Sequence, residues 1–146
     1  MMQATRRTSY FLYGTLMDRD VLNIVSGLNL SQVRLRPALL PGYRRVRDVH
    51  YPAVFPSEAH SVEGCVVHGI SEPAAARIGL FEIDGYDLVV EQVVLGNRRS
   101  LKAALFAASG RMNLSDEDWS FEDWRNQHRR RFRQSVKSWA DKLDHS

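Results

Sequence analysis

The sequence predicts an α+β fold in a single domain, because two different hydrophobic patterns divide the chain. About six short apolar or alternating segments, separated by turns rich in glycine and proline, occupy most of residues 9–108 and are typical of β-strands. Apolar residues at helical spacing replace them in the last third, where a long helix is expected at about residues 116–143. Strands and helices segregated in this way favour an α+β architecture.

Composition is that of an ordinary globular protein and excludes several other classes. The chain has 146 residues, 44% hydrophobic and 25% charged, so we expect one domain spanning residues 1–146 with one core. No segment approaches the roughly 20 apolar residues of a membrane-spanning helix, and we expect no export signal at the N-terminus. Cys65 is the only cysteine, which favours the reducing cytoplasm and argues against a metal site; we expect no cofactor.

The first elements are a strand and a short helix. Residues 9–13 (SYFLY) form an apolar and aromatic run that ends at Gly14, as a strand does at a tight turn. A helix is expected at residues 18–26, because an acidic start precedes closely spaced apolar residues and Gly27 is a natural C-terminal stop.

The middle of the chain alternates between strands and turns. Residues 33–40 alternate until Pro41-Gly42, where we expect a turn, and residues 43–49 are a candidate partner strand. Residues 51–54 continue in extended conformation, and residues 62–70 form a further strand.

A second short helix precedes the clearest hairpin. Ser71 is placed to cap a helix with Pro73 in its first turn, and this helix runs towards Glu82. Residues 86–95 and 101–107 are strands joined by a turn at Gly96-Asn97. In the tail, Ser120 and Asp123 offer a capping box, and the helical stripe consists of Phe121, Trp124, His128, Phe132, Val136, Trp139 and Leu143.

The turn after the first strand is the first candidate for chemistry. Tyr13, Gly14, Thr15 and Leu16 place consecutive backbone N–H groups at a glycine turn, where anions and developing negative charge are stabilised. Because many strands end in glycine, this pattern alone does not assign a function.

Four motifs together resemble the gamma-glutamylcyclotransferase-like family. The sequence YGTL lies near the N-terminus, Tyr-Pro-Ala-Val begins at Tyr51, Val-Glu-Gly begins at Val62, and Phe81-Glu82 is followed by Gly85-Tyr86. The resemblance covers about residues 10–107 and implies a compact mixed β-barrel with flanking helices. It further implies cyclisation of a gamma-glutamyl amide or peptide to 5-oxoproline with release of the amine.

The resemblance also assigns roles to individual residues. Glu82 corresponds to the catalytic glutamate of the family, and Tyr13, Gly14, Thr15 and Leu16 correspond to its substrate-binding turn. Tyr86 is a further candidate substrate contact, with ordinary packing as the alternative, while Tyr51 is expected to be a packed loop anchor.

The implied chemistry needs few groups. The substrate amine is tethered near its own gamma carbonyl, so ring closure requires no enzyme nucleophile. A carboxyl whose pKa is raised by apolar neighbours can take a proton from the ammonium group and pass one to the leaving amine. Glu82 lies beside Leu80, Phe81 and Ile83, and the turn amides are available for the oxyanion.

Two alternative functions remain open from sequence. Many relatives have Leu-Asp where this chain has Ile78-Gly79, and glycine where it has Ile83, so a binding domain without activity is one alternative. The arginines clustered at residues 129–133 suggest nucleic-acid binding, but acidic residues at 116–123 favour a solvated helix with local ion pairs instead. We therefore expect a small gamma-glutamyl substrate, with no nucleic-acid or membrane partner and with monomer or homodimer undetermined.

Overall fold

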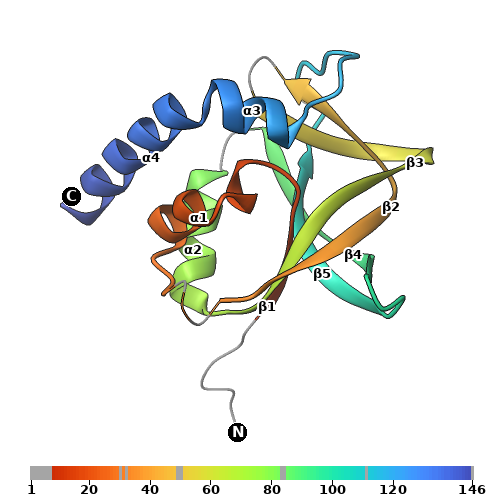
Figure 1. The fold of residues 1–146 in the computed structure, drawn as a ribbon, viewed down its shortest axis with the longest axis horizontal. Helices are drawn as coiled ribbons and strands as arrows, with labels where there is room; N and C mark the ends of the chain where they lie inside the picture. The colour runs from red at the N-terminus through yellow and green to blue at the C-terminus, as the bar shows by residue number, and fades with distance from the viewer. Residues whose placement is uncertain are drawn as a thin grey trace, which may run out of the picture.

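The core of the protein is a closed barrel of five strands (Figure 1). The computed structural model describes residues 8–29, 31, 33–48, 51–82, 85–110 and 112–145. The strands are β1 (Thr8–Leu12), β2 (Leu35–Asp48), β3 (Tyr51–Ile70), β4 (Tyr86–Leu95) and β5 (Ser100–Ala108). Their order around the barrel is β1-β3-β2-β4-β5. The barrel is mixed, because β1 and β5 are parallel whereas the other neighbours are antiparallel.

The barrel has five strands where about six were predicted, because two expected breaks are absent. Pro41 pairs with Ser61 in the β2–β3 ladder, and a register shift between Pro41 and Tyr43 accommodates Gly42, whose φ is +78°. The backbone therefore makes a bulge and stays in the sheet where we expected a turn. Likewise, the two segments expected at 51–54 and 62–70 belong to one continuous strand, β3.

The remaining short elements agree with the sequence. Strands β4 and β5 pair along their length, from Tyr86 opposite Ala108 to Val94 opposite Ser100, so the hairpin is confirmed. Helix α1 (Arg19–Ser26) begins at Asp18, whose side chain accepts from the Val21 amide, and it ends at Gly27 with φ +75°. Helix α2 (Glu72–Phe81) begins at Ser71, whose hydroxyl accepts from the Ala74 amide. Between β1 and α1 lies a 3-10 turn, η1 (Thr15–Met17).

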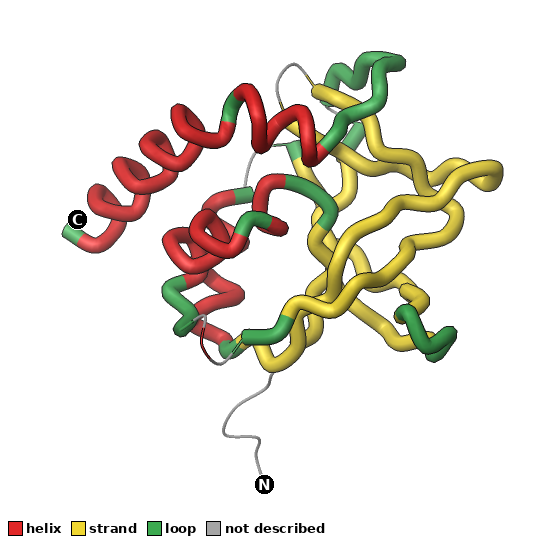
Figure 2. Tube along the Cα trace, in the orientation of Figure 1, coloured by secondary structure: helices red, strands yellow, loops and turns green. Residues whose placement is uncertain are grey.

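The tail contains two helices where the sequence predicted one. Helix α3 (Phe121–Gln127) begins after Ser120, whose side chain accepts from the Asp123 amide, and α4 (Arg129–Asp144) follows the non-helical residue His128. The helix starts later than residue 116 because the preceding segment is held on β2. There the Arg47 amide donates to the Glu117 carbonyl at 2.9 Å. Figure 2 shows the helices gathered on one side of the barrel.

The core has two parts, one inside the barrel and one between the barrel and the helices. Successive side chains of β1 point alternately into one part and into the other. Phe11 points into the barrel with Leu40, Val66 and Leu105, whereas its neighbour Leu12 packs outside, against the helices. Gly64 of β3 allows this arrangement, since a Cβ there would overlap the Leu12 carbonyl and approach the Phe11 ring to 2.7 Å. Among the described residues, no helix is both long and apolar enough to span a membrane.

Candidate active site

A cavity of about 970 Å³ lies where the β1–η1 turn, the end of α2 and the C-terminal helices meet. Every site residue predicted from the sequence borders it: Tyr13, Gly14, Thr15, Leu16, Glu82 and Tyr86. Residues from three separate parts of the chain are thus brought to one place.

The turn at residues 13–16 borders this cavity and contains backbone donors that have no partner among the described residues. Met17 and Asp18 donate to the carbonyls of Gly14 and Thr15, which forms the single turn of η1. No acceptor among the described residues receives the N–H groups of Gly14, Thr15 and Leu16, as is usual for the first residues of a helical turn. Consecutive free N–H groups of this kind form a concave site for an anion.

Arg45 of β2 holds this turn from outside the cavity. Its guanidinium donates to the Tyr13 carbonyl at 2.8 Å and to the Glu63 carbonyl at 3.0 Å. It also lies over the ring of Trp119, at 5.4 Å from the centroid. Because carbonyl and following N–H point in opposite directions across a trans peptide, this contact orients the Gly14 N–H away from Arg45.

Gly14 leaves no room for a side chain. A Cβ at this position would lie 2.5 Å from Cγ of Pro52. The position of a side chain is therefore already filled by the proline ring. The Pro52 carbonyl in turn accepts from the Tyr86 hydroxyl at 2.7 Å, so the turn, β3 and β4 are linked at the cavity.

Glu82 follows the last turn of α2 and is half-buried at the cavity. Its amide donates to the Ile78 carbonyl at 3.0 Å, which holds the backbone in place. Burial disfavours the charged carboxylate and raises the pKa of Glu82 to about 7. The side chain is thus present in both protonation states near neutral pH, as a group that alternately accepts and donates a proton requires.

Tyr13 lies within electrostatic range of Glu82. Its hydroxyl donates to the Phe106 carbonyl at 2.5 Å. Burial raises the pKa of Tyr13 well above its ordinary value, with further contributions from Tyr86 and Glu82. Tyr13 is therefore a neutral hydrogen-bonding group at the site and not a base.

One protein family matches most of the chain. A model of the family described as "Gamma-glutamyl cyclotransferase, AIG2-like" matches residues 10–126. The chain belongs to this family. Among its curated relatives, the AIG2-like protein A of Arabidopsis thaliana is 30% identical over 135 residues, which cover 87% of this chain and 78% of the relative.

Solved structures of similar proteins share the fold. A solution structure of an Arabidopsis thaliana protein matches with a TM-score of 0.68 at 24% identity. The match covers 95% of this chain and 94% of the Arabidopsis protein. A structure named gamma-glutamyl cyclotransferase has a TM-score of 0.64 at 10% identity, covering 90% of this chain and 87% of its own. At these identities the likeness establishes the barrel architecture alone.

The two departures from the family pattern lie differently in the structure. Gly79 is in α2 but does not border the cavity, and a Cβ there would have no neighbour within 4 Å. Ile83 lies outside the described residues. The glycine at position 79, where many relatives have aspartate, therefore does not remove a side chain from the cavity wall.

The sequence did not predict that the C-terminal helices would border the cavity. Trp124, Phe132, Val136 and Trp139 were assigned to a packing stripe, but all four also line the cavity. Tyr51, predicted to be a packed anchor, is 50% exposed at the cavity. The helical spacing of apolar residues in the tail was the one signal that could have indicated this wall. It could not, because apolar residues that pack on a core and apolar residues that face a cavity recur at the same spacing.

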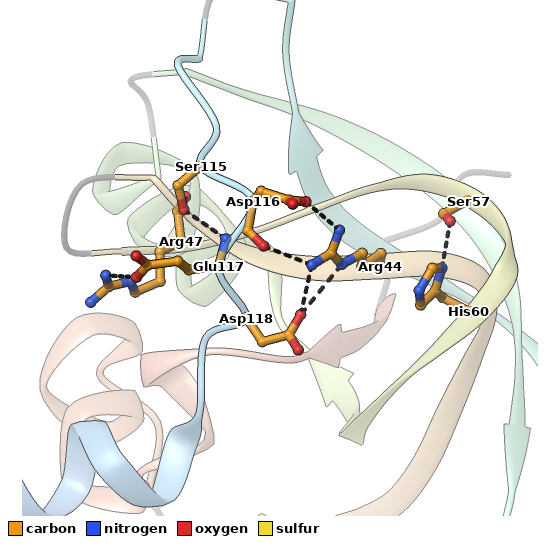
Figure 3. Close-up of polar contacts among 8 residues, drawn as sticks. All are labelled: Arg44, Arg47, Ser57, His60, Ser115, Asp116, Glu117 and Asp118. Atoms are coloured by element: carbon orange, nitrogen blue, oxygen red, sulfur yellow. Dashed lines mark hydrogen bonds and ion pairs between the residues drawn. The ribbon is translucent and has the colours of Figure 1, made fainter.

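The acidic residues before α3 pair with β2, contrary to the expected local pairs with the arginine cluster (Figure 3). Arg44 contacts Asp116 at 2.9 Å and Asp118 at 3.1 Å, and Arg47 pairs with Glu117. These contacts dock the segment that carries Trp119 into the cavity wall.

Within the arginine cluster, two side chains are engaged elsewhere. Arg129 binds Asp18 at 2.5 Å and Asp20 at 2.7 Å, and Arg133 lies 3.8 Å from Asp20. The cluster thus ties α4 to the start of α1.

Metal and thiol chemistry have no support in the described part of the chain. It contains no group of His, Cys, Asp and Glu side chains able to hold a metal ion. Cys65 is buried, and burial raises the pKa of its thiol to about 11, which leaves little thiolate at neutral pH.

Proposed function

We propose that this protein is a gamma-glutamylcyclotransferase that converts a gamma-glutamyl amide or peptide to 5-oxoproline and a free amine. The observation that supports the proposal is that Glu82, whose pKa is about 7, borders the same cavity as residues 14–16, whose amides have no acceptor among the described residues. Family membership supports the same reaction class. The proposed partner is a small cytoplasmic gamma-glutamyl compound, and no cofactor takes part.

Ring closure begins with a proton transfer to Glu82. The ionised carboxylate takes a proton from the alpha-ammonium group of the substrate, and the freed amine attacks the gamma carbonyl carbon. The attacking nitrogen and the carbonyl belong to one molecule, so correct positioning replaces a covalent enzyme intermediate. The new C–N bond closes a five-membered ring and places negative charge on the carbonyl oxygen.

The turn amides stabilise that charge. Gly14, Thr15 and Leu16 border the cavity, and their N–H groups have no acceptor in the part of the chain that the structure describes, so they are suited to the oxyanion or to the substrate carboxylate. Glu82 then gives its proton to the leaving nitrogen, and the carbonyl re-forms as the old C–N bond breaks. The ring nitrogen gives up its second proton to the departing amine, which leaves as an ammonium ion, so Glu82 ends in its starting state and the cycle needs no further reactant.

The test compares Glu82→Gln with the wild type in two measurements on the same preparations. Glutamine keeps the shape of the side chain but cannot accept the proton. We expect wild-type protein to release 5-oxoproline from at least one compound in a gamma-glutamyl panel. The variant should bind that compound by calorimetry but lose on the order of a hundredfold or more in turnover.

Three outcomes would count against the proposal. Near-normal turnover by Glu82→Gln would remove Glu82 from the mechanism. Loss of folding together with activity would make its role structural. Binding of gamma-glutamyl compounds by wild type without any release of 5-oxoproline would indicate an inactive binding member of the family.

A further inference from the structure

The cavity is much larger than a gamma-glutamyl group requires. Its volume of about 970 Å³ is near the upper end of the roughly 300–1,000 Å³ found for small-molecule pockets. One face of α4 supplies the additional wall, with Arg131, Phe132, Ser135, Val136 and Trp139 at helical spacing, and His128 borders the cavity just before the helix begins. The family match ends at residue 126, before α4 begins, and so assigns this wall no role.

Aromatic rings form this wall close to the reacting groups. The Phe132 ring centroid lies 6.0 Å from that of Tyr51 and 6.2 Å from that of Phe81. Phe81 directly precedes Glu82, and Tyr51 directly precedes Pro52, which packs on Gly14. Phe132 is only partly buried, so an apolar surface faces the cavity between the two sides of the site.

Arg131 is a cation at this wall that forms no ion pair with any described acidic side chain. Arg47 and Asp118 also border the cavity, but they pair with Glu117 and Arg44. Asp123 lies in the first turn of α3, where the helix dipole stabilises its charge. Among the described residues, Arg131 has no ion-pair partner, and it is exposed in the turn of α4 that carries Phe132.

We propose that α4 forms the subsite for the leaving amine and selects amines that carry both an aromatic side chain and a carboxylate. The ring of such an amine stacks among Tyr51, Phe81 and Phe132, and its carboxylate binds the Arg131 guanidinium. Gamma-glutamyl dipeptides that end in an aromatic residue fit this description. This inference rests on the proposed function and specifies the substrate class for the same site.

The experiment uses three substrates that differ in one feature each. Gamma-glutamyl-phenylalanine has both the ring and the carboxylate, gamma-glutamyl-phenethylamide lacks the carboxylate, and gamma-glutamyl-alanine lacks the ring. We expect kcat/KM for the first to exceed that for each of the others by about tenfold or more, the scale of one charge-assisted hydrogen bond or one well-filled apolar subsite. Ratios between substrates on one preparation do not depend on the fraction of protein that is folded.

Substitutions in α4 test whether this helix is the source of the substrate preference. Arg131→Gln should remove the preference for phenylalanine over phenethylamide, and Phe132→Leu should reduce the preference for phenylalanine over alanine. Arg130→Gln is the matched control, because Arg130 neighbours Arg131 and is exposed but does not border the cavity. This control should leave both ratios unchanged.

The outcomes separate this inference from the proposed function. Turnover of all three compounds with ratios near one, or equal effects of Arg131→Gln and Arg130→Gln, would overturn the subsite while leaving cyclisation intact. If no compound is turned over, cyclisation fails, and calorimetry with the same compounds decides the subsite. Tighter binding of gamma-glutamyl-phenylalanine that depends on Arg131 would then support it, whereas equal or undetectable binding would overturn it.

Discussion

Because burial raises the pKa of Glu82, we expect Glu82→Gln to be more stable than wild type at pH 8. The pKa of this carboxyl rises from an ordinary value of 4.5 to about 7 on folding. Between these two values the folded protein binds more protons than the unfolded chain, so stability falls as pH rises. The contribution of Glu82 is fully present below pH 4.5 and is lost as pH passes through 7.

The magnitude follows from the size of the pKa change. A rise from 4.5 to about 7 corresponds to roughly 3 kcal/mol, at about 1.4 kcal/mol for each pH unit. Glu82 is half-buried, so solvent screening reduces this upper value. We expect the stability of Glu82→Gln relative to wild type to increase by about 2 kcal/mol between pH 5 and pH 8.

Urea unfolding of both proteins at the two pH values measures this difference, because the titration of all other groups cancels. Glu58→Gln is the control, since Glu58 is exposed on β3 and its substitution should have an effect within about 0.5 kcal/mol at either pH. A relative stability of Glu82→Gln that does not change with pH would refute the reasoning. So would a variant that is less stable than wild type at pH 8.

Further predictions concern the support of the turn. Gly14→Val should lower 5-oxoproline release by about a hundredfold, because the valine side chain collides with the Pro52 ring and displaces the turn. Thr15→Ser is the control and should retain release; equal rates of release by the two variants would contradict this prediction. Arg45→Lys should lower kcat about tenfold with less change in KM, because lysine has no planar guanidinium that can lie over Trp119 while it donates to the Tyr13 and Glu63 carbonyls. A change in KM alone would contradict this role. Gly64→Ala should cost about 1–3 kcal/mol in urea unfolding, because its Cβ overlaps the Leu12 carbonyl and the Phe11 ring; an unchanged midpoint would contradict this packing.

Local elements of the fold were predictable from sequence because local chemistry determines them. Asp18, Ser71 and Ser120 each cap a helix with a side-chain oxygen, and Gly27 adopts the left-handed conformation that ends α1. These signals depend on neighbours within a few residues. They were confirmed for that reason.

Strand continuity could not be predicted in the same way. Pro41-Gly42 is a typical turn signal, but pairing with β3 on both sides keeps the chain in the sheet and converts the signal into a bulge. The deciding contacts come from residues about twenty positions away, such as Ser61. Barrel closure likewise depends on the pairing of β1 with β5, which no local pattern encodes.

The candidate site was predictable only where the family resemblance supplied motifs. Glu82 and the turn at residues 13–16 matched such motifs, and the structure brings them to one cavity. Arg45 and Arg131 had no motif, and their contacts depend on how β2 and α4 pack against the rest of the protein. The pKa of Glu82 also depends on packing, because desolvation arises from atoms distant in sequence.

The pH dependence of 5-oxoproline release tests the central claim most directly. If ionised Glu82 accepts the substrate proton, kcat/KM should fall about tenfold for each pH unit below 7 and level off above it, following the pKa of about 7. The residual activity of Glu82→Gln should lack this limb. A wild-type profile that is flat between pH 5 and pH 8, or the same limb in the variant, would contradict the role of Glu82 in proton transfer.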